Sequence, residues 1–248
     1  MSTLLRAELL KQRTTRMVPV VLAASLAIAV LALTQIIDNA GVRGAPSLGT
    51  LAHARQIIGV PVLASIPLLV LGVMSVTTEY RHGTVTATFL AEPIRWRVLV
   101  SKVVVAAGLA FAWAVVAVVV VNAIAIPWLA REGVDHLAML TPTLWTSIAV
   151  SLVVLPLFAA MGVGIGAIAR SQVPAVVVPI VWLLLLEPNL IAPRFTAIER
   201  YLPGVASSIA GSTPHAPAAP FWFGLVVLVA WVAVLLAAGT AMTRRRDL

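Results

Sequence analysis

The fold of this chain is decided by the stretch Thr77–Lys102, whose sequence is TTEYRHGTVTATFLAEPIRWRVLVSK. The stretch lies between two long apolar segments. Six of its side chains are charged, namely Glu79, Arg81, Glu92, Arg95, Arg97 and Lys102. Burying all of them at the centre of a bilayer would cost on the order of 15–20 kcal/mol. The stretch is therefore predicted to lie in water or at the headgroup surface, between two membrane spans.

The composition places the whole chain among membrane proteins. Of the 248 residues, 61% are hydrophobic and only 10% are charged, whereas soluble domains are about 25% charged. The chain has no cysteine, which excludes disulfides and thiolate metal sites. The net charge is +8, but Lys and Arg flank the apolar segments and form no stripe. The positive charge thus indicates membrane orientation, and no nucleic-acid partner is predicted.

The apolar segments predict an all-α membrane protein with a single transmembrane domain over residues 1–248. Six spans are expected, at Met17–Ile37, Gln56–Thr77, Val103–Leu129, Leu144–Ala169, Val173–Ala192 and Phe221–Ala241. Residues 1–16 are expected to form a short interfacial lead-in helix, and residues 193–220 an extracytoplasmic loop. Within that loop, Phe195–Leu202 is either a short amphipathic helix or plain surface loop. Arg170–Gln172 is predicted to be a very tight turn.

The distribution of positive charge predicts the orientation. Six spans leave both termini on one side of the membrane, and that side carries twelve of the 17 Lys and Arg residues. The opposite side carries the remaining five, which are Arg43, Arg55, Arg131, Arg194 and Arg200. Positive residues favour the cytoplasmic side. Both termini and residues 78–102 are therefore predicted to be cytoplasmic.

The sequence offers little support for an enzyme. The four histidines, His53, His82, His136 and His215, all lie outside the predicted spans. Serines within the spans, such as Ser65 and Ser151, therefore have no histidine at membrane depth to act as a base. No H-E-x-x-H and no G-x-x-x-x-G-K-[ST] motif is present. We therefore predict no catalytic, metal or cofactor site in this chain.

Two features inside the spans have structural and functional interpretations. Gly162 and Gly166 lie in an apolar span with no preceding strand, so they predict close helix packing and not a phosphate-binding loop. Glu187 is the acidic residue closest to a hydrophobic midsection, and an ionisable residue at that depth suggests function. The alternatives are that Pro188 ends the helix and leaves Glu187 at the outer interface, or that Glu187 pairs with Arg194. Mid-span tryptophans such as Trp182 either contact a substrate or pack against lipid and protein.

Three parts of the sequence resemble the permease subunits of bacterial ATP-binding-cassette exporters of the second integral-membrane class, the multidrug and antibiotic-efflux type. The first is Leu5–Lys11, which is similar to the N-terminal connecting helix of that family. The second and third are Thr78–Thr84 with Leu90–Arg97 and Lys102, and Gly162–Gln172 with Trp182, Glu187 and Arg200–Pro203. The resemblance covers nearly the whole chain.

The resemblance implies a partnership with a separate ATPase subunit that binds ATP and Mg²⁺. It also implies a pair of permease chains, identical or different, in the bacterial cell membrane. A coupling helix between spans two and three would contact the ATPase, and the matching residues here are Glu79, Tyr80, Arg81, His82, Gly83 and Thr84. Glu187 and Trp182 become candidates for a translocation path taking an amphiphilic drug, antibiotic or lipid-like substrate.

The residue types in this segment suit such a role. Gly83 can break the helix leaving the membrane, Thr84 can cap the next helix, and Pro93 can start the returning one. Glu79 and Arg81 are expected to form ion pairs across the interface. The alternative is a membrane protein outside this family, namely a secondary carrier, a scaffold or an intramembrane enzyme. A carrier would usually show internal repeats, and none is evident.

Overall fold

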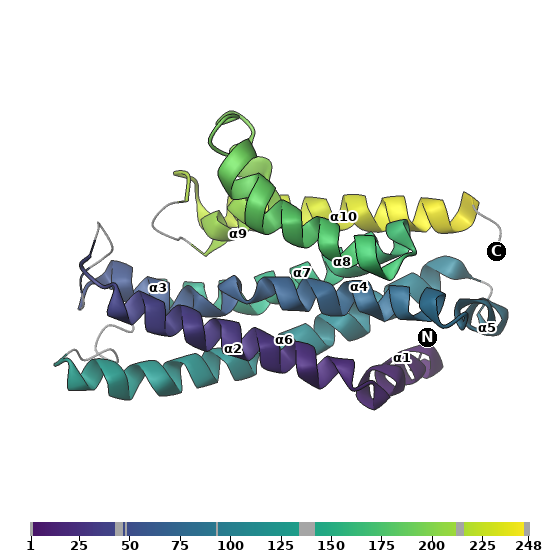
Figure 1. Ribbon diagram of the computed structural model, residues 1–248, viewed down its shortest axis with the longest axis horizontal. Coiled ribbons are helices and arrows are strands. Elements are labelled where there is room, and N and C mark those ends of the chain that lie inside the picture. The colour runs from purple at the N-terminus through teal and green to yellow at the C-terminus, as the bar shows by residue number, and fades with distance from the viewer. Residues whose placement is uncertain are drawn as a thin grey trace.

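The computed structural model describes residues 2–42, 47, 49–92, 94–133, 142–211 and 216–245. Within these ranges the chain forms helices, turns and bends and no strand, which confirms the all-α prediction. The helices run roughly side by side as an elongated bundle, with α1 (Ser2–Thr14), α5 (Val85–Ala91) and the C-terminal end of α10 (Phe221–Arg245) at one end (Figure 1).

Within the described ranges, six helical segments are long and apolar enough to cross a membrane, as predicted. They are α2 (Met17–Asp38), α3 with α4 (Leu51–Leu63 and Ser65–Arg81), α6 (Arg95–Arg131), α7 (Pro142–Ala169), α8 with the π-helical segment η2 (Gln172–Val181 and Trp182–Ile191), and α10. The α6 helix has 37 residues, so it is about 55 Å long. Because the hydrocarbon core is about 30 Å thick, part of α6 must extend beyond it.

Two of these spans bend where proline interrupts their hydrogen bonding. The second span breaks at Ala64, between α3 and α4. Pro67 has no N–H to donate back along the helix, and Ser25 of α2 donates its hydroxyl to the Ala64 carbonyl at 3.1 Å. In η2, Pro188 lies inside the helix, and the Asn189 amide donates to the Leu185 carbonyl at 3.0 Å. Side-chain donors thus add hydrogen bonds to backbone carbonyls close to these prolines.

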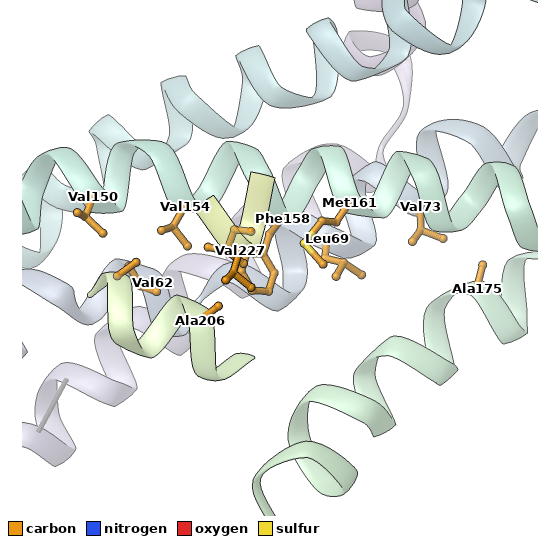
Figure 2. Close-up of a cluster of buried hydrophobic side chains, with 12 residues drawn as sticks. Val62, Leu69, Val73, Val150, Val154, Phe158, Met161, Ala175, Ala206 and Val227 are labelled. Atoms are coloured by element: carbon orange, nitrogen blue, oxygen red, sulfur yellow. The ribbon is translucent and has the colours of Figure 1, made fainter. Parts of the chain in front are cut away.

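The centre of the bundle is α7, which packs against α3, α4, α6 and α10. Its Phe158 is fully buried and lies in a cluster with Leu69 of α4, Val227 of α10 and Ala206 of the short helix α9 (Pro203–Ala210) (Figure 2). By contrast, the α8–η2 span and α10 leave most of their apolar surface uncovered within this chain. The bundle therefore has a well-packed centre and outer helices suited to contact lipid or another chain.

Glycines allow α4 and α7 to approach closely. A Cβ atom on Gly162 would overlap the Leu69 carbonyl oxygen, and one on Gly72 would overlap the Ala159 carbonyl oxygen. A Cβ on Gly166 would come within 2.8 Å of the Val73 carbonyl oxygen. The structure thus places Gly162 and Gly166 against the backbone of the second span.

The connections match the predictions in part. The tight turn between α7 and α8 is present, with Arg170 at φ 53°. Of the two alternatives for Phe195–Leu202, the structure shows the surface loop, because this segment forms turns and a single 3-10 turn, η3 (Glu199–Tyr201). The α-helix here is α9, which begins at Pro203. Proline is favoured at the first helical position, where its missing N–H costs no hydrogen bond.

Replacing Gly162 by alanine is expected to lower the thermal unfolding temperature of the purified chain. The added methyl group would force α4 and α7 apart, and overpacking of this kind costs about 1–3 kcal/mol. Tryptophan fluorescence during heating in detergent measures the effect. The control is Gly108→Ala in α6, because no atom lies within 4 Å of a Cβ at that position. Equal unfolding temperatures for the two variants would contradict the proposed close packing.

Candidate functional site

The segment that joins the second and third spans turns at Gly83. Gly83 has φ +67°, a conformation that costs glycine little. The Thr84 N–H donates to the Glu79 carbonyl at 3.0 Å, and the Gly83 N–H to the Tyr80 carbonyl at 3.3 Å. This pair of bonds is the Schellman arrangement that ends helices. The α4 helix therefore ends before Gly83, and α5 begins at Val85, directly after Thr84.

The α5 helix begins as predicted, but its cap differs. Thr84 occupies the N-cap position without any side-chain cap hydrogen bond, so the expected side-chain cap is wrong. Its backbone is already helical, with φ −83° and ψ −6°, whereas a capping hydroxyl needs an extended backbone. Pro93, the expected start of the returning helix, lies outside the described residues. The helix that follows, α6, begins at Arg95.

One face of this segment is open, and we call it the α5 surface. Val85 is buried against the bundle, whereas the Leu90 side chain is 79% exposed. The exposed members of the α5 surface are Arg81, His82, Gly83, Thr84, Thr86, Ala87 and Leu90. An exposed leucine beside polar groups is a combination that protein interfaces use.

Two of the six predicted contact residues do not face outward. Glu79 is only 7% exposed, and the Tyr80 ring is partly covered by the Arg170 guanidinium, 5.6 Å from the ring centroid. Arg81 is exposed but donates to the Gln172 side chain at 2.9 Å, which ties the end of α4 to the start of α8. The structure therefore does not support an ion pair of Glu79 across an interface, because this carboxylate is occupied within the chain.

Glu79 belongs to an ion cluster with Glu8, Lys11 and Lys102, in which Glu8, Glu79 and Lys102 are buried. The Lys102 ammonium donates to Glu79 at 2.8 Å, to Glu8 at 2.9 Å and to the Ser75 carbonyl at 3.1 Å. Lys11 donates to Glu79 at 2.6 Å and to Glu8 at 2.9 Å. All three ammonium protons of Lys102 thus have acceptors, which a buried lysine requires. Two positive and two negative charges balance.

The ion cluster joins α1, the end of α4 and the start of α6. Glu8 and Lys102 are 3% and 4% exposed, so this cluster is a structural junction and not a surface pair. Burial lowers the pKa of Lys11, but its hydrogen bonds to Glu79 and Glu8 outweigh burial and raise that pKa above the usual value. The stabilisation from Lys11 is therefore complete at neutral pH and is lost only as the pH rises through this raised pKa.

Sequence reasoning missed this cluster, although α1 carried a signal. The face of α1 turned toward the bundle is polar, since Glu8 and Gln12 are buried and Leu10 is 62% exposed. A short helix whose apolar residues form no continuous stripe can indicate that its polar residues have partners elsewhere. The partners themselves, at positions 79 and 102, could not be identified from the pattern of α1.

A second group of predicted residues gathers at the other end of the bundle. Glu187 is 1% exposed, and its Oε1 accepts a hydrogen bond from the Val205 N–H at the start of α9, at 2.7 Å. The Trp182 side chain also approaches this carboxylate. Pro188 does not end the helix, and no ion pair joins Glu187 to Arg194 among the described residues. The helix end at Pro188 and the ion pair with Arg194 therefore do not fit the structure, and the depth of Glu187 in the membrane stays a prediction.

The described residues contain no cluster of three or more His, Asp or Glu side chains that could hold a metal ion. One expectation about the histidines is wrong, because His53 is buried in the first turn of α3 and within the second span. Thr50 caps this helix by accepting from the His53 N–H at 3.2 Å, so α3 starts earlier than the apolar run suggested. His136 and His215 lie outside the described residues.

Replacing Lys102 by methionine is expected to destabilise the purified chain strongly. Methionine keeps much of the volume but leaves two buried carboxylates without a central cation, a change that costs about 3–5 kcal/mol. The fall in thermal unfolding temperature measures it. The matched control is Arg97→Met, since the Arg97–Glu92 pair is 4.0 Å apart and more exposed. If Lys102→Met unfolds at the temperature of the control, the ion cluster does not hold these helices together.

Comparison with known proteins agrees with this architecture. The family model described as ABC-2 family transporter protein matches residues 4–186, which run from α1 to the middle of η2. No curated protein matches the chain. The match includes the ion cluster and the α5 surface, and it covers well over half of the chain. The resemblance seen in the sequence is confirmed: the chain is a multi-pass membrane protein that belongs to the ABC-2 transporter family.

Proposed function

We propose that this chain is the membrane-spanning subunit of an ATP-driven exporter. It forms the translocation path for an amphiphilic drug, antibiotic or lipid-like substrate and pairs with a second permease chain. A separate ATPase subunit binds ATP and Mg²⁺ and docks on the α5 surface. The chain itself catalyses no reaction, and it resides in the bacterial cell membrane with α1 and α5 on the cytoplasmic side.

The observation that carries this proposal is the connection of α5 to three spans. Gly83 joins α5 directly to α4, and Lys102 ties Glu79 of α4 to the beginning of α6. In addition, the Arg95 guanidinium donates to the Thr243 carbonyl of α10 and lies over the Phe89 ring of α5, 5.3 Å from its centroid. A force on α5 therefore acts on α4, α6 and α10 together.

The charge distribution supports the cytoplasmic placement. Figure 1 shows α1, α5 and the end of α10 at one end of the bundle, and these elements belong to the side that carries twelve of the 17 positive residues. Positive residues are retained on the cytoplasmic side of membranes. An ATPase supplied with cytoplasmic ATP would meet the α5 surface there.

Purification of the tagged full-length chain from its native cells tests the partnership. We expect a polypeptide with a G-x-x-x-x-G-K-[ST] loop to copurify, together with ATPase activity. Leu90→Asp is expected to reduce this recovery at least about fivefold, because removal of a buried apolar interface anchor commonly costs more than 1 kcal/mol. Mass spectrometry and the ATPase rate give the two readouts.

The control is Ile198→Asp, which places the same charge on an exposed apolar position at the opposite end of the bundle. Ile198 is 49% exposed and lies far from α5 in the chain. This variant should copurify with the ATPase as the unmodified chain does. A stable chain that copurifies with no ATPase, or a Leu90→Asp variant that retains it fully, would contradict the proposal.

A further inference from the structure

A cavity of about 460 Å³ lies between the second span, η2 and α9. Figure 1 shows α9 at the end of the bundle opposite α5. The walls are largely apolar and include Val62, Ile66, Phe158 and Leu183. This volume is within the range that binds small organic molecules.

The polar groups of this cavity carry negative charge without a matching positive one. Glu187 and Glu199 both line it, and none of its described lining residues is Lys, Arg or His. The hydroxyls of Ser207 and Ser208, also in the lining, donate to the Gly204 carbonyl at 2.7 and 3.2 Å. Their protons are therefore engaged within α9. The cavity thus offers negative charge to a ligand.

One oxygen of the Glu187 carboxylate lacks a hydrogen bond of normal geometry. Its side chain is almost completely buried, its Oε1 accepts from Val205, and its Oε2 has no partner of normal hydrogen-bond geometry among the described residues. A buried carboxylate oxygen without a donor is costly. A ligand that brings a donor and a positive charge would remove that cost.

The carboxylate is also held in place by its surroundings. A Cβ atom at Gly204 would lie 2.6 Å from Glu187 Oε1, so only glycine leaves room for this contact. The start of α9 fixes Oε1, while Trp182 approaches from one turn earlier in η2. Glu187 is among the residues that line the cavity, and these contacts hold its carboxylate in a fixed position.

We propose that this cavity binds a protonated amine attached to an apolar body. Glu187 Oε2 accepts a hydrogen bond from the ammonium N–H, Glu199 adds a second negative charge, and the apolar walls hold the body. A quaternary ammonium ion fits less well because it has no N–H for Oε2. The inference rests on the proposed function in one respect, since it assigns a substrate class to the translocation path.

Binding of 4-phenylbutylamine to the purified full-length chain in nanodiscs of zwitterionic lipid tests the proposal. No ATPase or nucleotide is present, and tryptophan fluorescence reports binding near Trp182. The amine is expected to bind at least about tenfold more tightly than 4-phenylbutanol or the trimethylammonium analogue, since a hydrogen bond to a charged group is worth about 1.5–3 kcal/mol. Equal affinity for the three compounds would overturn the proposal.

Glu187→Gln should lose this preference for the amine, since glutamine retains the carbonyl that accepts from Val205 but lacks the charge. The matched control is Glu132→Gln at the exposed end of α6, outside the cavity, which should bind the amine normally. Full amine binding by Glu187→Gln would overturn the proposal. If that variant does not fold, the comparison of the three compounds on the unmodified chain still decides. Amine binding by a chain that recruits no ATPase would contradict the exporter function while leaving the site intact.

Discussion

The buried ammonium group of Lys102 is the interaction that holds together the end of the bundle containing α1 and α5. A lysine 4% exposed to solvent is tolerated only because Glu8, Glu79 and the Ser75 carbonyl each accept one of its protons. These acceptors belong to α1 and α4, whereas Lys102 itself is in α6. Satisfying one cation therefore brings three helices to a fixed arrangement. The α5 helix, which lies between α4 and α6 in the chain, takes its position from that arrangement.

The remainder of the bundle is built from close helix packing and from side-chain hydrogen bonds to backbone carbonyls. Gly72 and Gly162 let α4 and α7 touch through their backbones, which joins the second span to the centre of the fold. Ser25 and Asn189 satisfy carbonyls near the two proline-interrupted sites. At the far end, Glu187 links η2 to the start of α9. The two ends of the molecule thus have different chemistry: a neutral, fully paired ion cluster at one and an acidic, incompletely paired cavity at the other.

The sequence predicts the fold well because burial in a bilayer leaves few choices. Six long apolar segments, a helix-ending glycine at position 83 and a tight turn at Arg170 are local signals, and the structure contains all of them. The outward orientation expected of Glu79 was wrong because its partners are remote. Lys102 and Glu8 are separated by 94 residues, and no local pattern specifies such a pairing. An isolated charge next to a span looks the same in sequence whether it faces water or a buried partner.

The same limit applies at the other end of the bundle. The position of Glu187 near the middle of an apolar segment drew attention to it, but its contact with α9 depends on how a loop folds back over the membrane span. Pro203 marks the start of α9, whereas the sequence leaves Phe195–Leu202 open between a short helix and a surface loop. His53 lies inside the second span although the apolar run in the sequence begins after it. Helix ends and long-range polar contacts are therefore what the sequence leaves undetermined.

In the proposed exporter, ATP-driven movement of α5 is expected to reach the far end of the spans through the ion cluster. The absence of cysteine allows spin labels at Arg131→Cys and Trp222→Cys, at the far ends of α6 and α10. Their distance is measured by electron paramagnetic resonance in the complex with the ATPase, diluted with unlabelled chain, with and without ATP. The account predicts that ATP changes this distance in the otherwise unmodified chain and not in Lys102→Met, provided both complexes hydrolyse ATP. An equal change in both would contradict the claim.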